Sequence, residues 1–197
     1  MGRSWCIAVL LGVAFQGVAA TALAEEPTSA VACATMPSNV QMPLALQLAV
    51  DQLLAQSSTL RRQCAAIAAA GPRTRLTIVV APPDLRGCRA RATFSWRASG
   101  ALDVRIEVPF TYDFPELIAH ELEHVVEQIE GLDLRQLAAR QSTGVEEVAA
   151  GTFETRRARN AGRAAALEVE TQSHLARVRR ATVAAMAANR IPALVAE

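Results

Sequence analysis

The chain has 197 residues, 51% of them hydrophobic, which is enough for one domain to bury a core without metals or disulfides as staples. All 20 basic residues are arginine, and they nearly cancel 19 acidic residues to leave a formal net charge of +1. Because there is no basic excess, the charge gives no indication of a nucleic-acid partner, and none is expected.

Residues 1–24 have the features of a secretory signal. Arg3 precedes the apolar run "WCIAVLLGVAFQGVAA", and "TALA" before two glutamates offers an A-x-A cleavage site after Ala24. The run is short for a stable anchor, although an uncleaved anchor is the alternative. We therefore expect a periplasmic or secreted protein with no stable membrane span after cleavage.

Cleavage would remove Cys6 and leave Cys33, Cys64 and Cys88 in an oxidising compartment. An odd number allows at most one disulfide within the mature chain, so one thiol would be free or would pair between molecules. The sequence does not indicate which two cysteines pair.

Residues 25–42 are expected to form a flexible leader, and residues 43–197 a single domain with a helical extension at its C-terminus. Apolar residues at helical spacing predict helix from Leu44 to Ala70, ended by Gly71–Pro72. Three extended stretches follow, "RLTIVVA", "RARATFSW" and "ALDVRIEVPF". The last alternates cleanly between apolar and polar residues from Leu102 to Phe110, which predicts a half-buried antiparallel strand.

A second helix is predicted to begin at Asp113 as N-cap, with Glu116 completing a capping box, and to end at Gly131. From about Val145 the sequence is rich in alanine and arginine, which predicts one or two long helices. The fold class is therefore α+β, with a small antiparallel or mixed sheet of about three strands packed on helices.

Within the second helix, His120-Glu121-Leu122-Glu123-His124 is an H-E-x-x-H pattern. Residues four apart lie on one helix face, so both imidazoles project toward a common point and can share a Zn²⁺ ion. Glu121 lies about 100° around the helix from His120. That offset lets its carboxylate act as a general base on water beside the metal.

The order of strand, H-E-x-x-H helix and further helix resembles the zincin metallopeptidases over roughly residues 75–165. The resemblance implies a zincin-like fold, a Zn²⁺ cofactor and a peptide or protein substrate. It also implies that an extended peptide pairs with an edge strand, which would here be Leu102–Phe110.

The third metal ligand distinguishes the zincin subgroups. The metzincin pattern needs glycine and histidine where this chain has Glu127 and Glu130, and the aspzincin pattern needs aspartate at Thr155. The gluzincin pattern needs a glutamate on a following helix, for which Glu154 is chosen. The alternatives to Glu154 are Glu147, Glu146 and His174.

On that expected helix, the small residues Ala150, Gly151, Ala158 and Ala161 would share a face with Glu154 and let two helices approach closely. Familiar gluzincins often carry an acidic residue four positions after the third ligand to orient a histidine, and this chain has Ala158 there. Another group, such as a backbone carbonyl, would have to replace it.

The chain is thus predicted to be a zinc-dependent hydrolase, and specifically a peptidase, with His120, His124 and Glu154 as metal ligands and Glu121 as catalytic base. Oxyanion donors are limited to Tyr112 and His174, and Arg105 is a candidate for a substrate carboxylate. Two alternatives stay open: an envelope zinc-binding or scaffold protein without activity, and a helical envelope protein without metal.

Overall fold

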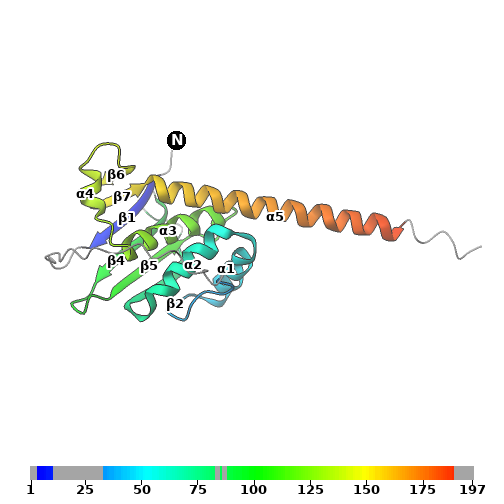
Figure 1. Ribbon diagram of the computed structural model, residues 1–197, viewed down its shortest axis with the longest axis horizontal. Helices are drawn as coiled ribbons and strands as arrows, with labels where there is room; N and C mark the ends of the chain where they lie inside the picture. The colour runs from blue at the N-terminus through cyan, green and yellow to red at the C-terminus, as the bar shows by residue number, and fades with distance from the viewer. Residues whose placement is uncertain (1–3, 11–32, 83–84, 86–87, 189–197) are drawn as a thin grey trace, which may run out of the picture.

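The computed structural model describes residues 4–10, 33–82, 85 and 88–188 of the chain (Figure 1). It has an α+β fold, in which a five-stranded mixed sheet and a separate two-stranded hairpin accompany five α-helices. The strands of the sheet are β1 (Ser4–Leu10), β2 (Val40–Gln41), β3 (Thr74–Val80), β4 (Cys88–Trp96) and β5 (Leu102–Val108). The helices are α1 (Leu44–Gln56), α2 (Ser58–Ala70), α3 (Phe114–Ile129), α4 (Leu134–Ala138) and α5 (Arg156–Ala188), and a 3-10 turn, η1, spans Gly71–Arg73.

The sheet has the strand order β1-β4-β5-β3-β2. Strands β4 and β5 form an antiparallel hairpin, and β3 pairs with β5 in parallel. The two outer strands, β1 and β2, pair in parallel with β4 and β3. The prediction of about three strands missed both, because they come from segments assigned to the signal and the leader.

The prediction that Leu102–Phe110 is an edge strand is wrong. Strand β5 is hydrogen-bonded to β4 on one side and to β3 on the other, so its backbone is not free to pair with a peptide. The alternating pattern correctly indicated one buried face, but alternation does not reveal a strand's position in the sheet. The edge strands of the sheet are β1 and β2.

The core lies between one face of the sheet and the helices. Alternate residues of the three central strands are buried on that face, among them Ile78, Phe94 and Ile106. Helix α3 packs on β4 and β5, while α2 and α5 pack against α3. Helix α3 is therefore enclosed on several sides, and most of its side chains are buried.

The region after Val145 is not continuously helical as predicted. A hairpin of β6 (Val145–Ala149) and β7 (Thr152–Thr155) comes first, with Gly151 in its turn at φ 68°. Helix α5 follows and has 33 residues. Its first part packs on α3, and its second part extends away from the rest of the domain (Figure 1). Among the described residues, no helix combines the length and apolar character needed to cross a membrane.

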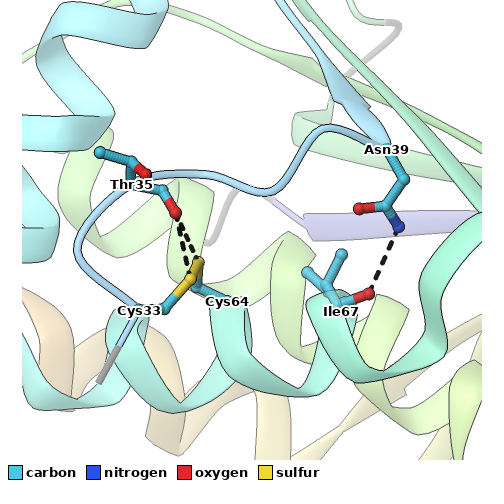
Figure 2. The surroundings of a disulfide bond; sticks show 5 residues. All are labelled: Cys33, Thr35, Asn39, Cys64 and Ile67. Atoms are coloured by element: carbon cyan, nitrogen blue, oxygen red, sulfur yellow. Dashed lines mark hydrogen bonds between the residues drawn. A yellow bond between two sulfur atoms is a disulfide. The ribbon is translucent and has the colours of Figure 1, made fainter. Parts of the chain in front are cut away.

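The second half of the predicted leader is attached to the domain. Figure 2 shows a disulfide between Cys33 and Cys64 of α2, with a sequence separation of 31. The amide nitrogen of Asn39 donates to the backbone oxygens of Ile67, Gly71 and Thr74. These bonds hold the chain beside α2 and allow β2 to join the sheet.

In the full chain, Cys33 and Cys64 are not the only paired cysteines, and the free or intermolecular thiol expected for the mature chain stays a prediction. Cys88 is also disulfide-bonded, with a partner outside the described side chains, and no cysteine among the described residues is free.

Candidate metal centre

The start of α3 is attached to β4 by an ion-pair cluster. Asp113 occupies the N-cap position as predicted, but its side chain caps no backbone N–H. Its carboxylate instead accepts a 2.7 Å hydrogen bond from Arg89 of β4 and another from the Thr111 hydroxyl. Arg89 also reaches Glu116 at 3.3 Å. The predicted capping box is therefore wrong, and the two acids fix the helix to the neighbouring strand.

The H-E-x-x-H helix brings its two histidines together with Glu154. The Nε2 atoms of His120 and His124 are 3.1 Å apart, and Oε1 of Glu154 lies 3.5 Å from the first and 3.9 Å from the second. Ligands bound at about 2.0–2.1 Å in a tetrahedron are roughly 3.3 Å apart. The three residues are buried, and their ligand atoms lie within 4.8 Å of one another, so this group could hold a metal ion.

Glu154 reaches this point from a strand, although a helix was expected. It lies in β7, opposite Glu146 of β6, and α5 begins two residues later. The expected helical face of small residues is therefore wrong for Ala150 and Gly151, which belong to the hairpin turn region. The backbone N–H of Thr155 donates to Oε1 of Glu154 at 2.7 Å and orients its carboxylate.

The small residues later in the sequence do allow close helix packing. Ala158, Ala161 and Gly162 of α5 are buried. A Cβ atom added to Gly162 would lie 2.8 Å from the backbone oxygen of Glu116 and 3.3 Å from Cβ of His120. Helix α5 therefore approaches the metal-site helix at a distance that only glycine permits.

Glu127 supplies the histidine-orienting carboxylate that is missing at Ala158. Its Oε2 lies 2.7 Å from Nδ1 of His124, so the ring donates from Nδ1 and directs the Nε2 lone pair toward the shared point. The Thr155 hydroxyl donates to the other Glu127 oxygen at 2.6 Å and accepts from the N–H of Ala158 at 2.9 Å. Thr155 thus caps α5 and holds Glu127 in place.

Glu123, inside the motif, faces away from the site and joins three helices. Its buried carboxylate accepts hydrogen bonds from Arg62 at 2.7 Å and Gln63 at 2.6 Å, both of α2, and from Arg157 of α5 at 2.5 Å. Burial raises the pKa of Glu123, but these three donors outweigh burial and lower it. Glu123 therefore stays charged and fixes the position of α3.

Burial dominates the ionisation of the site residues. It lowers the pKa of His120, with further lowering by His124, Arg159 and Arg89, so this imidazole is neutral as a metal ligand must be. Burial raises the pKa of Glu154 to about 7, against the opposing effects of the Thr155 N–H and Arg159. Burial and the charge of Glu154 raise the pKa of Glu121 well above its usual value, while the Ala92 backbone lowers it.

Several site oxygens are buried without hydrogen-bond partners among the described residues. They are both carboxylate oxygens of Glu121 and Oε2 of Glu154. Leaving a buried polar atom unpaired costs about 1–3 kcal/mol, and more for a charged group. A cation held by His120, His124 and Glu154 would offset this cost at Glu154 and favour its charged form, so the residues present fit a bound metal.

The alternative third ligands lie elsewhere. Glu147 is exposed and accepts a hydrogen bond from the Gly151 N–H, and Glu146 pairs with Arg159 at 3.4 Å. His174 is exposed on α5, after the last buried residue of that helix. Only Glu154 of these four joins the two histidines in the described part of the chain.

The two further candidates for binding substrate are exposed or already paired. Tyr112 is 97% exposed, and Arg105 lies 3.6 Å from Glu107 on its own strand. A positively charged side chain that the sequence did not indicate, Arg159, lies nearer to the metal site. Its Nε is 3.9 Å from Oε1 of Glu154. Arg159 follows Glu154 by five residues, and this spacing does not predict a contact unless it is known that a strand ends and a helix begins between them.

Comparisons with protein-family models, with curated proteins and with solved structures found no match to this chain.

Proposed function

We propose that this chain is a small zinc-dependent peptidase with a zincin-like site of gluzincin type. The observation that supports it is the meeting of two motif histidines and a glutamate from β7 in one buried group. The Glu121 carboxylate, on the same helix as the histidines, is also buried. Two imidazoles and one carboxylate form the ligand set of zinc peptidases that leave a fourth position open. Delivery of Glu154 by a strand is a departure from the gluzincin pattern.

His120, His124 and Glu154 would hold the zinc ion, with Glu127 and Thr155 fixing the tautomer and orientation of His124. Zinc supplies Lewis-acid activation of water when it is bound. Glu121 accepts the proton of the attacking water as the water oxygen bonds to the amide carbon. As the C–N bond breaks, the same carboxyl returns the proton to the departing amine nitrogen.

The proposal is tested with Glu121→Gln in the purified protein. The amide keeps the shape of the side chain but cannot accept the proton, so zinc content should stay at one ion per chain while peptide hydrolysis falls by about 100-fold or more. Elemental analysis measures the first quantity, and cleavage of a diverse peptide library measures the second.

Glu170→Gln is the matched control, because Glu170 is exposed on the distal part of α5. This variant should keep both zinc and activity. Full activity in Glu121→Gln would show that the assigned base is wrong, and absence of zinc from the unaltered protein would contradict the whole proposal.

A zinc-binding protein without hydrolytic activity is the second candidate, and the enclosure of the site favours it. His120 and His124 are each 0% exposed, and Glu121 is 1% exposed. Stoichiometric zinc without cleavage of any library peptide, in every form of the protein, would support this candidate. A third possibility, coincidence of the motif, predicts equal thermal stability with and without a chelator.

Export to the periplasm or the exterior is part of the same proposal and rests on the features of residues 1–24. N-terminal sequencing of the exported protein tests it, with Glu25 expected as the first residue.

A further inference from the structure

The metal centre is closed to solvent when the whole chain is present. The two histidines and Glu121 are at most 1% exposed, and Glu154 is 4% exposed. A peptide cannot reach an enclosed carboxylate, so hydrolysis requires that some element bordering the site be displaced. The need for displacement rests on the proposed function, because a peptide substrate must reach Glu121 whereas a permanently bound metal ion need not be reached.

Strand β1 is an edge strand of the sheet and lies next to two elements that support the site, β4 beneath α3 and β7 with Glu154. It pairs with β4 along one side only, and it also contacts β6 and β7 of the hairpin, as Figure 1 shows. In the register, Ile7 is opposite Ala92, a buried residue of the strand on which α3 packs. On its other side, β1 contacts the strand that carries Glu154. Its backbone therefore runs between the elements that place the base and the third ligand.

The other bordering elements are poorly suited to move. Helix α3 carries both histidines and is fixed by Glu123, and β7 carries Glu154 and is tied to Glu127 through Thr155. Strand β4 is also paired with β5 inside the sheet. Strand β1 holds none of the metal donors, so its departure would leave the donor set intact.

We propose that Ser4–Leu10 blocks the metal site in the full chain and that removal or displacement of this segment opens it. The segment belongs to the predicted signal, so cleavage after Ala24 together with reduction of the disulfide at Cys88 would convert a closed precursor into an open enzyme. Loss of β1 also leaves β4 as an unpaired edge, which presents free N–H and C=O groups on the strand that supports α3.

The experiment uses the full chain made by cell-free synthesis without membranes, so that residues 1–24 are retained. The double variant Ile7→Pro/Ala8→Pro removes two adjacent backbone N–H groups. Successive N–H groups of a strand point to opposite sides, so one of the two faces β4 and its hydrogen bond is lost. Ala19→Pro/Ala20→Pro, in the same signal but outside β1, is the matched control. A phosphine reductant is present throughout, because Cys88 at the start of β4 is disulfide-bonded.

Three quantities are measured: zinc per chain, the rate at which a small chelator removes the zinc, and peptide hydrolysis. In the β1 variant we expect unchanged zinc content, chelation at least about tenfold faster, and a matching gain in hydrolysis. The control should behave like the unaltered chain. Val9→Pro/Leu10→Pro, at the end of the strand, repeats the test if the first variant does not fold by circular dichroism.

The outcomes separate the two proposals. Equal zinc and equal chelation rates in folded β1 variants and control would overturn the blocking role of β1 and leave the zinc site standing. Faster chelation without any hydrolysis would support the blocking role and contradict the peptidase. A chain that binds no zinc in any form would overturn both.

Discussion

Glu127 is the side chain whose removal should most directly disturb the metal site without deleting a ligand. It holds Nδ1 of His124 at 2.7 Å and is itself held by Thr155. Glu127→Ala should weaken zinc affinity by about 10–100-fold, because His124 loses the partner that fixes its tautomer and ring orientation. A competition titration against a chelator of known affinity measures the change.

Glu130→Ala is the control for this prediction, on the same helix. Glu130 is partly exposed and pairs with Arg157, so its loss should cost at most about 1 kcal/mol of stability and leave zinc affinity unchanged. If both variants bind zinc like the unaltered protein, Glu127 does not orient the histidine.

The candidate site was largely accessible from the sequence because one helix carries most of it. His120, Glu121 and His124 follow from the 3.6-residue period of α3, which places them without knowledge of the rest of the fold. The resemblance to gluzincins indicates Glu154, but on a helix where the structure has strand β7. Glu127 and Arg159 were missed, because their roles depend on distances between elements that no local spacing specifies.

At the level of elements, the contact of α5 with α3 depends on Gly162. In Gly162→Ala the new methyl group would meet the Glu116 backbone oxygen and push the helices apart. We expect a net loss of stability, since overpacking costs about 1–3 kcal/mol and alanine returns only about 1 kcal/mol of helix propensity. Urea unfolding measures the change.

Thr171→Ala, at an exposed position of the same helix, should be neutral or slightly stabilising and isolates the propensity effect. A Gly162→Ala variant more stable than the unaltered protein would mean that α5 does not lie as close to α3 as described.

Helix α5 is also joined to the start of α2 through Glu168. Its carboxylate accepts hydrogen bonds from the hydroxyls of Ser57 and Ser58 and from the Thr59 backbone N–H. Burial raises the pKa of Glu168, but these bonds outweigh burial and lower it below its usual 4.5. The charged form therefore stabilises the fold above pH 4.5, and this contribution is lost as the pH falls through the lowered pKa.

Glu168→Gln should accordingly reduce the free energy of unfolding by about 1 kcal/mol at neutral pH, a modest value because the carboxylate is partly exposed. The difference from the unaltered protein should shrink as the pH is lowered below 4.5, which chemical unfolding at several pH values can follow. A difference that grows in acid would contradict the assigned sign.

The elements themselves were predicted unevenly, for physical reasons. Helix α3 and the strands β4 and β5 follow from periodicity, which is a local signal. The single helix predicted from Leu44 to Ala70 is instead two helices, α1 and α2, separated by Ser57 in an extended conformation. The helix predicted from Val145 is wrong for β6 and β7. The β6 sequence "VEEVA" has no strong preference for helix or strand, so its conformation depends on its pairing with β7 and on the tertiary contacts of Glu154 and Thr155. The order of the strands could not be predicted from the sequence, because most paired strands are distant from each other along the chain.

On the scale of the whole molecule, the two parts of α5 differ in their importance for stability. A 33-residue helix is about 50 Å long. Ala165 is its last fully buried residue, and the residues from Leu175 to Ala187 are exposed. A chain that ends at His174 should therefore keep its zinc content and its midpoint of thermal unfolding.

Ending the chain at Ala166 instead provides the contrast. This truncation removes Glu168 and the partly buried Val169, which packs against the core, so the midpoint should fall by several degrees. A similar fall for the chain ending at His174 would show that the distal helix supports the domain.

The covalent link between Cys33 and Cys64 encloses all of α1 within a ring of the polypeptide. Reduction would release the segment before α1 from its anchor while the three Asn39 hydrogen bonds remain as the competing restraint. Limited proteolysis at the peptide bonds between Thr35 and Pro43 would therefore report the oxidation state of the protein. The same cut would separate everything N-terminal to α1 from the domain only in the reduced molecule.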